Sequence, residues 1–220
     1  MKKLFSEKLQ LDWKIGLLTV VSTSLLIIVS YHPNIFPWTK WFPGWNSTGL
    51  SVQLLDRMVL YFVVPMFVIL IVFRQKPSEF GFTFGDWKAG IVLTLGGIVL
   101  IAPVLWWVAR GNSAMRDYYR PMASGLPWNT FLDLFSWEFL FRGWLLFGYG
   151  RKFGPEAIWI QAVPFALAHI GKPEVETLST IFGGFVFGWV AWRTKSYLYP
   201  LLIHWFVASF VIIVAGGFLG

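Results

Sequence analysis

The chain has 220 residues, of which 56% are hydrophobic, 20% are aromatic and only 13% are charged. Because a soluble domain carries about 25% charged residues, this composition excludes an ordinary soluble domain and indicates a polytopic membrane protein. The absence of cysteine excludes disulfides, thiolate metal sites and a cysteine nucleophile. The net charge of +7 comes from Lys and Arg that flank apolar segments, which predicts contact with membrane lipid and no binding of nucleic acid.

Seven apolar segments follow one another along the chain and predict an all-α fold, a polytopic membrane helical bundle with about seven transmembrane or membrane-embedded helices. Several of them are shorter than the roughly 20 residues that a perpendicular span needs, which predicts short helices buried among their neighbours. The Gly-rich run IFGGFVFGW, with Gly183, Gly184 and Gly188, predicts a face where helices pack closely. The seven segments are residues 15–31, 58–73, 89–109, 128–149, 157–170, 178–192 and 198–219.

Basic residues set the expected orientation in the membrane. They cluster at the N-terminus and in the loops after the second, fourth and sixth segments, which lie on one side if there are seven spans; the third loop, with three Arg, opposes this arrangement. By the positive-inside rule we expect a multi-pass protein of a bacterial cytoplasmic membrane with a cytoplasmic N-terminus. The basic residues on that side are Lys2, Lys3, Lys8, Lys14, Arg74, Lys76, Lys88, Arg151, Lys152, Arg193 and Lys195.

The fourth apolar segment carries a Glu–Arg pair. Glu138 and Arg142 are four residues apart and therefore share one face of a helix. A charge in the middle of a bilayer costs about 2.5–3.5 kcal/mol, so an intramembrane Glu marks a functional site by default, although a neutralised structural ion pair is the simpler alternative. Asp133 lies about 140° away from Glu138 around the helix and is expected to cap or to pair near the interface.

Two histidines lie in other apolar segments. His204 is flanked by apolar residues on both sides, so its imidazole needs a partner, for which Glu138 or a water molecule is the obvious candidate. His169 ends the fifth segment, where an interfacial histidine bonded to a loop is the alternative to a role in a site. His32, in YHPN, is expected to be a loop residue.

A Glu and a His that converge on one water molecule could deprotonate it for attack on an amide, while a second His hydrogen-bonds the oxyanion. The same three side chains would also permit a divalent metal ion, but they lack the HExxH spacing of a strong metal motif. We therefore expect no cofactor. No GxSxG sequence occurs, so a serine hydrolase is not supported.

Three motifs in consecutive apolar segments, WEFLFRG, FALAH and the later His204, resemble the signature motifs of the CPBP family, also called the Abi family. This family comprises membrane-embedded CAAX-processing and bacteriocin-processing endopeptidases. The resemblance covers roughly residues 127–212 and implies an intramembrane glutamate-type endopeptidase with Glu138, His169 and His204 as catalytic residues and Arg142 in support. The implied substrate is a peptide or protein, lipidated or membrane-anchored.

Two positions depart from the family pattern. The first motif usually has a Glu-Glu pair, and its first Glu, which activates the water with the FxxxH histidine, is Trp137 here. The Asn or Asp that ends the third motif and helps the last His stabilise the oxyanion is Ala208. Glu138 would then move into the base role unless Glu174 or Glu176, which follow His169 closely in the sequence, supplies it. A solvated loop position is favoured for Glu174, and Glu176 is placed in the site as a supporting residue at the entry to the next helix.

We divide the chain into N-terminal transmembrane helices and loops (1–126), a CPBP/Abi-like catalytic core (127–212) and the end of the last helix (213–220). Two further hypotheses stand beside the endopeptidase. An inactive family member could bind a peptide, lipid or protein partner in the same cavity, which Trp137 and Ala208 favour. A small transporter could use Glu138 and His169 as a proton relay, but the sequence has no inverted repeat.

Overall fold

The computed structural model describes residues 10–32, 34–44 and 51–218, and these residues form helices and no strands. Three elements, η3, η4 and η7, are π-helical, and η5, η6 and η8 are 3-10 turns. In chain order the elements are α1 (Trp13–Tyr31), α2 (Trp38–Trp41), α3 (Val52–Arg57), η3 (Met58–Val63), α4 (Val64–Phe67), η4 (Val68–Val72), η5 (Pro77–Phe80), α5 (Trp87–Ala109), α6 (Ser113–Tyr119), η6 (Arg120–Gly125), α7 (Trp128–Glu138), η7 (Phe139–Leu145), α8 (Leu146–Phe153), η8 (Gly154–Glu156), α9 (Ala157–Leu167), α10 (Glu174–Thr194) and α11 (Leu198–Ala215).

The predicted helical membrane bundle is confirmed, although the number of spans is not. Within the described residues, five helical stretches are long and apolar enough to cross a membrane: Trp13–Tyr31, Val52–Val72, Trp87–Ala109, Glu174–Thr194 and Leu198–Ala215. The two other predicted segments are also helical. The fourth runs through α7, η7 and α8 and carries several charged residues, and the fifth is the 11-residue helix α9.

Several predicted boundaries are wrong. Helix α10 begins at Glu174, before the apolar run 178–192 and two residues before the expected entry at Glu176. Pro173 immediately precedes it, and two acidic residues in its first turn complement the helix dipole. Helix α9 ends at Leu167, so His169 lies in the turn that follows it. The last helix ends at Ala215 before Gly217 takes a positive φ, which means that residues 216–218 are not helical, while 219–220 lie outside the described residues.

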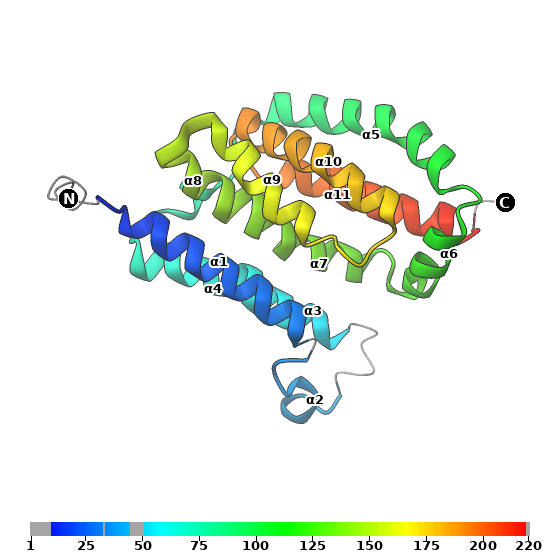
Figure 1. Cartoon of the computed structure of the whole chain (residues 1–220), viewed down its shortest axis with the longest axis horizontal. Coiled ribbons are helices and arrows are strands. Elements are labelled where there is room, and N and C mark those ends of the chain that lie inside the picture. Colours follow the sequence, from blue (N-terminus) through cyan, green and yellow to red (C-terminus); the bar gives the residue numbers. More distant parts are fainter. Residues whose placement is uncertain (1–9, 33, 45–50, 219–220) are drawn as a thin grey trace, which may run out of the picture.

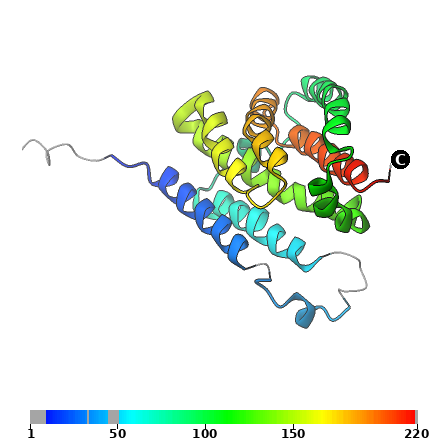
Figure 2. The same ribbon diagram turned by 45° about the vertical axis from the view of Figure 1, so that its right-hand side comes forward.

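The helices form two groups (Figures 1 and 2). Helix α1 and the stretch α3 to η4 run side by side as an antiparallel pair on one side of the molecule. They pack against α7, η7 and α8, which connect them to a bundle formed with α9, α10, α11 and α5. In that bundle α11 contacts α5, α7 and α10, and α10 contacts α9. Helix η7 thus lies at the centre of the fold, between the N-terminal pair and the C-terminal helices.

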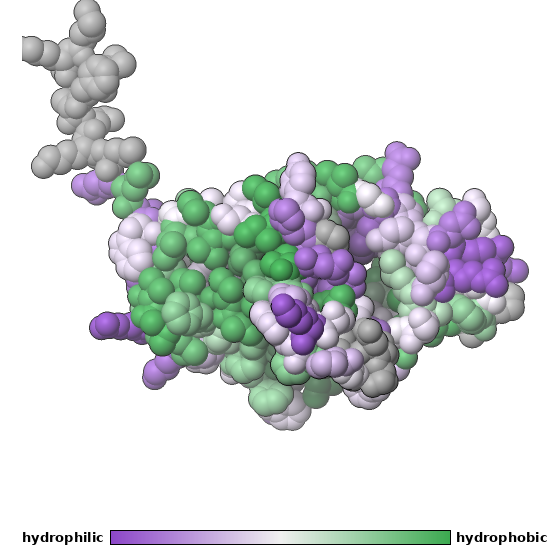
Figure 3. Space-filling view, turned by 90° about the horizontal axis from the view of Figure 1, so that it is seen from below, coloured by the Kyte–Doolittle hydropathy of each residue, from purple (hydrophilic) through white to green (hydrophobic). Residues whose placement is uncertain are grey.

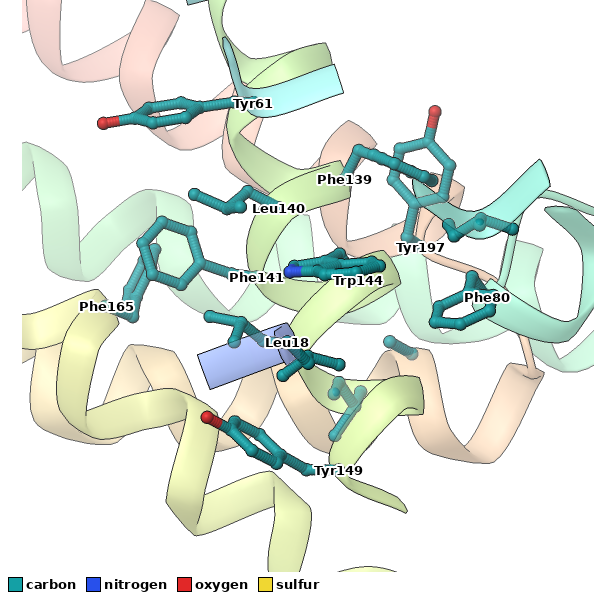
Figure 4. Packing of buried hydrophobic residues seen from close by; sticks show 14 of the residues in the cluster. Leu18, Tyr61, Phe80, Phe139, Leu140, Phe141, Trp144, Tyr149, Phe165 and Tyr197 are labelled. Atoms are coloured by element: carbon teal, nitrogen blue, oxygen red, sulfur yellow. The ribbon is translucent and has the colours of Figure 1, made fainter. Parts of the chain in front are cut away.

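Trp144 of η7 anchors the main hydrophobic core (Figure 4). Its fully buried indole stacks on Phe73 and Phe80, with ring centroids 5.6 and 5.9 Å away, and its Nε1 donates a hydrogen bond of 2.8 Å to Ser22 Oγ of α1. Because a buried indole N–H needs an acceptor, this bond ties α1 to the centre of the fold. The core therefore fixes η7, and with it the charged pair at its start.

The outer faces of several helices are apolar, as expected for helices that contact lipid. Helix α5 buries little of itself and leaves large side chains such as Val99, Leu100 and Trp107 more than 70% exposed. Figure 3 shows a further apolar area over α1 and α4. Exposed apolar area on this scale would favour aggregation of a soluble protein, so the bundle is built for a membrane.

Candidate active site

A cavity of about 1290 Å³ lies among α5, α7, α10 and α11. Its walls on α5 and α11 are mostly aliphatic, and α10 adds aromatic side chains. Gly96, Gly97 and Gly183 leave space where a side chain would stand. Polar residues line other parts of it. Two of these are the histidines His169 and His204, which sequence analysis placed in one site. The cavity is large enough for a substrate and is lined as ligand sites usually are, with few polar groups among apolar ones.

Glu138 is the junction of the buried polar cluster. Its Oε1 accepts a hydrogen bond from Arg142 Nη1 at 3.0 Å and lies 2.6 Å from His204 Nδ1. The Glu138 and Arg142 side chains are completely buried, and that of His204 is only 10% exposed. Glu138 ends α7 and Arg142 lies within the π-helical η7, a type of segment that is frequent at functional sites. The predicted Glu–Arg face and the predicted Glu138–His204 contact are both present.

Aromatic rings surround the Arg142 guanidinium. Its Cζ lies 3.8 Å from the ring centroid of Phe165 and 5.3 Å from that of Phe187. A cation over an aromatic face gains about 2 kcal/mol or more when it is desolvated, which partly offsets the burial of this charge. The phenylalanine of the FxxxH motif therefore has a physical role as the surface on which Arg142 rests.

His169 is held by the backbone of α9. Its Nδ1 lies 2.7 Å from the carbonyl oxygen of Phe165, and the residue is 2% exposed. A carbonyl oxygen can only accept, so Nδ1 carries the proton and Nε2 of the neutral ring is left as an acceptor. The rings of His169 and His204 lie nearly parallel with centroids 6.5 Å apart. The structure thus brings together the two histidines that sequence analysis selected from different helices.

Trp137 fills the space beside His169. Its indole meets the His169 ring edge to face at a centroid distance of 5.5 Å and also contacts Phe141 and Tyr61. The position that usually carries a carboxylate next to this histidine is therefore occupied by an aromatic side chain that packs into the core. Ala208 lies one helical turn after His204 and lines the cavity without a polar side chain.

Glu176 lines the same cavity, but both of its carboxylate oxygens have donors. Oε1 accepts from Lys172 Nζ at 2.9 Å, and Oε2 accepts from the hydroxyl of Tyr119. Burial of Tyr119, together with the Glu176 charge, raises the pKa of its hydroxyl, so the hydroxyl remains a donor. Glu176 therefore links α6 to α10 across the end of the cavity. Glu174 is exposed, as expected, but it is the first residue of α10 and not part of a loop.

Replacing Tyr119 with phenylalanine removes this link. We expect the free energy of unfolding to fall by about 1.5–3 kcal/mol, the usual contribution of a hydrogen bond to a charged group. Thermal unfolding in detergent measures the change, with Tyr118→Phe in the adjacent residue as the matched control. Equal melting temperatures for the two variants would show that the Tyr119–Glu176 bond does not stabilise this end of the cavity.

Asp133 pairs with a residue that sequence analysis did not select. Its Oδ2 lies 2.7 Å from Arg57 Nη1 of α3, and both residues line the cavity. Of the two expected roles for Asp133, capping or pairing near the interface, the structure shows pairing, with a partner 76 residues away in the sequence. The side chains are about one third exposed, so this pair differs from the dry cluster around Glu138. It gives the cavity a charged, wetter end beside Asn129 and Thr130.

The donor atoms of the site do not gather as metal ligands do. In the described part of the chain, no three His, Cys, Asp or Glu residues lie close enough to hold a metal ion together. Glu138 Oε1 already faces Arg142 and His204, and His169 Nδ1 faces a carbonyl. The arrangement fits the hydrogen-bonded Glu/His chemistry considered for the sequence.

Residues 121–210 match the family described as Type II CAAX prenyl endopeptidase Rce1-like. The match confirms the resemblance of the three motifs. This part of the chain is therefore similar to the CPBP family. Comparison with curated proteins and with solved structures gives no match. The CPBP segment covers 90 of the 220 residues and contains Glu138, Arg142, His169, Glu176 and His204.

The part of the chain that precedes the CPBP match also shapes the site. Helix α5 provides one apolar wall of the cavity, and Arg57 of α3 provides the partner of Asp133. Tyr119, two residues before the match, holds Glu176. These three contributions were missed because hydropathy identifies the segments but not which of their faces meet. In the sequence, only the position of Arg57 directly before the second apolar segment could have pointed to one of them.

Proposed function

We propose that the protein is an intramembrane endopeptidase of the CPBP type that hydrolyses a peptide bond with a Glu/His-activated water. The family match supports an intramembrane protease-type function, and the apolar helices support an integral membrane protein. The observation that carries the proposal is the convergence of His169 and His204 at one large cavity, with Glu138 bound to His204 behind it. Burial of a charged cluster in a membrane bundle is costly and is usually kept for function.

The proposed roles follow from the contacts. The two imidazoles line the cavity and can reach a water molecule beside a bound peptide, and each ring is held at Nδ1. The Glu138 carboxylate holds His204, while Arg142 supports Glu138 by pairing with it. Glu176 supports the cavity by its link to Tyr119. General acid–base catalysis of this kind contributes about 10²–10⁴-fold to a rate.

The cavity also suits the proposed substrate class. Its long aliphatic walls fit a membrane-anchored or lipidated peptide, and the Arg57–Asp133 end can contact polar groups of the peptide chain. Because an apolar anchor gains by leaving water, such a substrate would concentrate at the cavity from the surrounding lipid. We therefore propose peptides with an apolar anchor as substrates.

A second candidate function is binding of a peptide, lipid or protein partner without catalysis. It is favoured by one specific observation, the contact of the Trp137 indole with His169 at the position of the usual carboxylate. A binding protein would keep the cavity while losing turnover. For a peptide ligand, the two candidates differ only in whether a peptide bond is broken.

The test is cleavage of a labelled membrane-peptide library by the purified full chain in lipid bilayers. We expect defined cut sites with the unaltered protein and a loss of about 10²–10⁴-fold with His169→Ala. His32→Ala, which alters an exposed histidine at the end of α1, is the matched control and should cleave normally. Full activity of His169→Ala would refute its role. Tight binding of library peptides without any cleavage would favour the second candidate function.

A further inference from the structure

We infer that His204 is the base that takes the proton of the attacking water, and that Glu138 acts on it as a positioning residue. This inference rests on the proposed endopeptidase function and assigns its proton transfer. It differs from the role that the family resemblance implies for the last histidine, which is to stabilise the oxyanion. It also differs from the hypothesis that Glu138, the Glu that remains in the first motif, is itself the base.

The burial of Glu138 separates it from the substrate. Glu138 is 0% exposed, and among the described residues the cavity is lined by His204 and His169 but not by Glu138. Its Oε1 is already shared by Arg142 Nη1 and His204 Nδ1. A general base must come within hydrogen-bonding distance of the proton it removes. Glu138 therefore reaches the cavity through the His204 ring.

The protonation of His204 follows from its partner. The guanidinium of Arg142 is a permanent cation, and the carboxylate that pairs with it can only accept hydrogen bonds. Nδ1 of His204 must then donate to Glu138 across the 2.6 Å contact. In the neutral ring this leaves Nε2 with a free lone pair. Ala208, one turn further along α11, offers no competing polar group.

Other groups around His204 leave this arrangement undisturbed. The phenyl rings of Phe165 and Phe187 flank the imidazole at centroid distances of 5.9 and 5.2 Å. The titratable and charged groups near it are Glu138, Arg142 and His169, from α7, η7 and the turn after α9. The Glu138 and Arg142 charges compensate each other. The Glu138 carboxylate therefore holds His204 on one side, and aromatic rings flank the rest of its imidazole.

The two histidines can hold one water molecule. Each ring donates through Nδ1 to a fixed acceptor and keeps Nε2 as an acceptor. A water bridging two nitrogens needs about 2.8 Å for each hydrogen bond, which the 6.5 Å between the ring centroids can accommodate. With both of its hydrogens accepted, the water has an oxygen lone pair free to attack.

The proton transfer is balanced over the reaction. The water oxygen bonds to the carbonyl carbon, its proton moves to His204 Nε2, and the electrons of the C=O double bond pass to the oxygen. The imidazolium formed is stabilised by the Glu138 carboxylate at Nδ1. The C–N bond then breaks, and the proton on Nε2 moves to the leaving nitrogen. His204 returns to its neutral form, with a carboxylic acid and an amine as products.

The decisive experiment is ¹⁵N NMR of the full chain, labelled with ¹⁵N-histidine and placed in lipid nanodiscs. The chemical shifts of the imidazole nitrogens, measured at the pH of the cleavage assay, show which nitrogen carries the proton. The sequence has only three histidines, so His32→Ala and His169→Ala assign the signals. We expect Nδ1 of His204 to be protonated and Nε2 to be bare. In the double variant Glu138→Leu with Arg142→Met, which removes the whole buried pair, Nδ1 loses its acceptor. The proton should then move to Nε2, which faces the cavity and can donate to water there.

These results separate the inference from the proposed function when cleavage is measured on the same samples. A protonated Nε2 in the unaltered protein, or an unchanged tautomer in the double variant Glu138→Leu with Arg142→Met, overturns the inference even if peptides are cleaved. A bare Nε2 that becomes protonated in this double variant, with cleavage lost by up to about 10⁴-fold, supports it. The same tautomers without cleavage by the unaltered protein would confirm Glu138 as the positioning residue and refute the endopeptidase.

Discussion

Replacing His204 with alanine should lower the rate of peptide cleavage by about 10²–10⁴-fold. His204 lines the cavity, and its Nδ1 is held by Glu138, so its loss removes the group that takes the proton of the water. The effect should fall on kcat, because the apolar walls that bind the anchor of the substrate are unchanged. Single-turnover cleavage by equal amounts of folded protein measures it.

A second variant separates catalysis from folding. His204→Gln keeps a side chain that can hydrogen-bond Glu138 but cannot act as a base at neutral pH. It should melt in detergent close to the unaltered protein and still fail to cleave. His32→Ala, at the exposed end of α1, should cleave and melt normally. Cleavage by His204→Gln at the unaltered rate would contradict the role of His204.

Replacing Arg142 with alanine should lower the free energy of unfolding by about 3–5 kcal/mol, the usual cost of breaking a buried ion pair. Both members of the Glu138–Arg142 pair are fully buried, so removing the guanidinium leaves a carboxylate without its cation. The substitution also removes the group that rests on the Phe165 ring at 3.8 Å. Thermal unfolding in detergent and the yield of folded protein measure the effect.

Two controls test the cause of this loss. Lys88→Ala removes an exposed charge and should leave the melting temperature within the small range of surface changes. The double variant Glu138→Leu with Arg142→Met removes both charges at similar volume and should recover much of the stability, because replacing a whole buried pair with apolar residues is often neutral. Equal melting temperatures for Arg142→Ala and Lys88→Ala would show that the buried Glu138–Arg142 pair does not stabilise the fold.

The helical segments could be predicted because the signal is strong in each of them. In an apolar run such as residues 89–109, many consecutive residues are more hydrophobic than those of the intervening loops. The structure has a helix at each predicted run. Helix ends depend on a few residues, and this is where the errors lie. The start of α10 is set by Pro173 and two acidic residues, and the end of α11 by the backbone at Gly217.

The pairs within the site were predictable to different degrees. Glu138 and Arg142 follow from helical spacing, and the Glu138–His204 contact follows from the need of each buried group for a partner. The partners of Asp133 and Glu176 depend on how α3 and α6 dock, which no local pattern specifies. Similarly, Gly184 and Gly188 face α9 as expected, while Gly183 turns to the cavity.

The most direct measurement is cleavage of a membrane-anchored peptide by the purified chain in lipid bilayers made up in H₂¹⁸O, followed by mass spectrometry of the products. Attack by an activated water predicts one ¹⁸O atom in the new C-terminal carboxyl group with the unaltered protein and no product with His204→Ala. If the peptide binds in the cavity but stays intact with both proteins, the proposed endopeptidase function is contradicted.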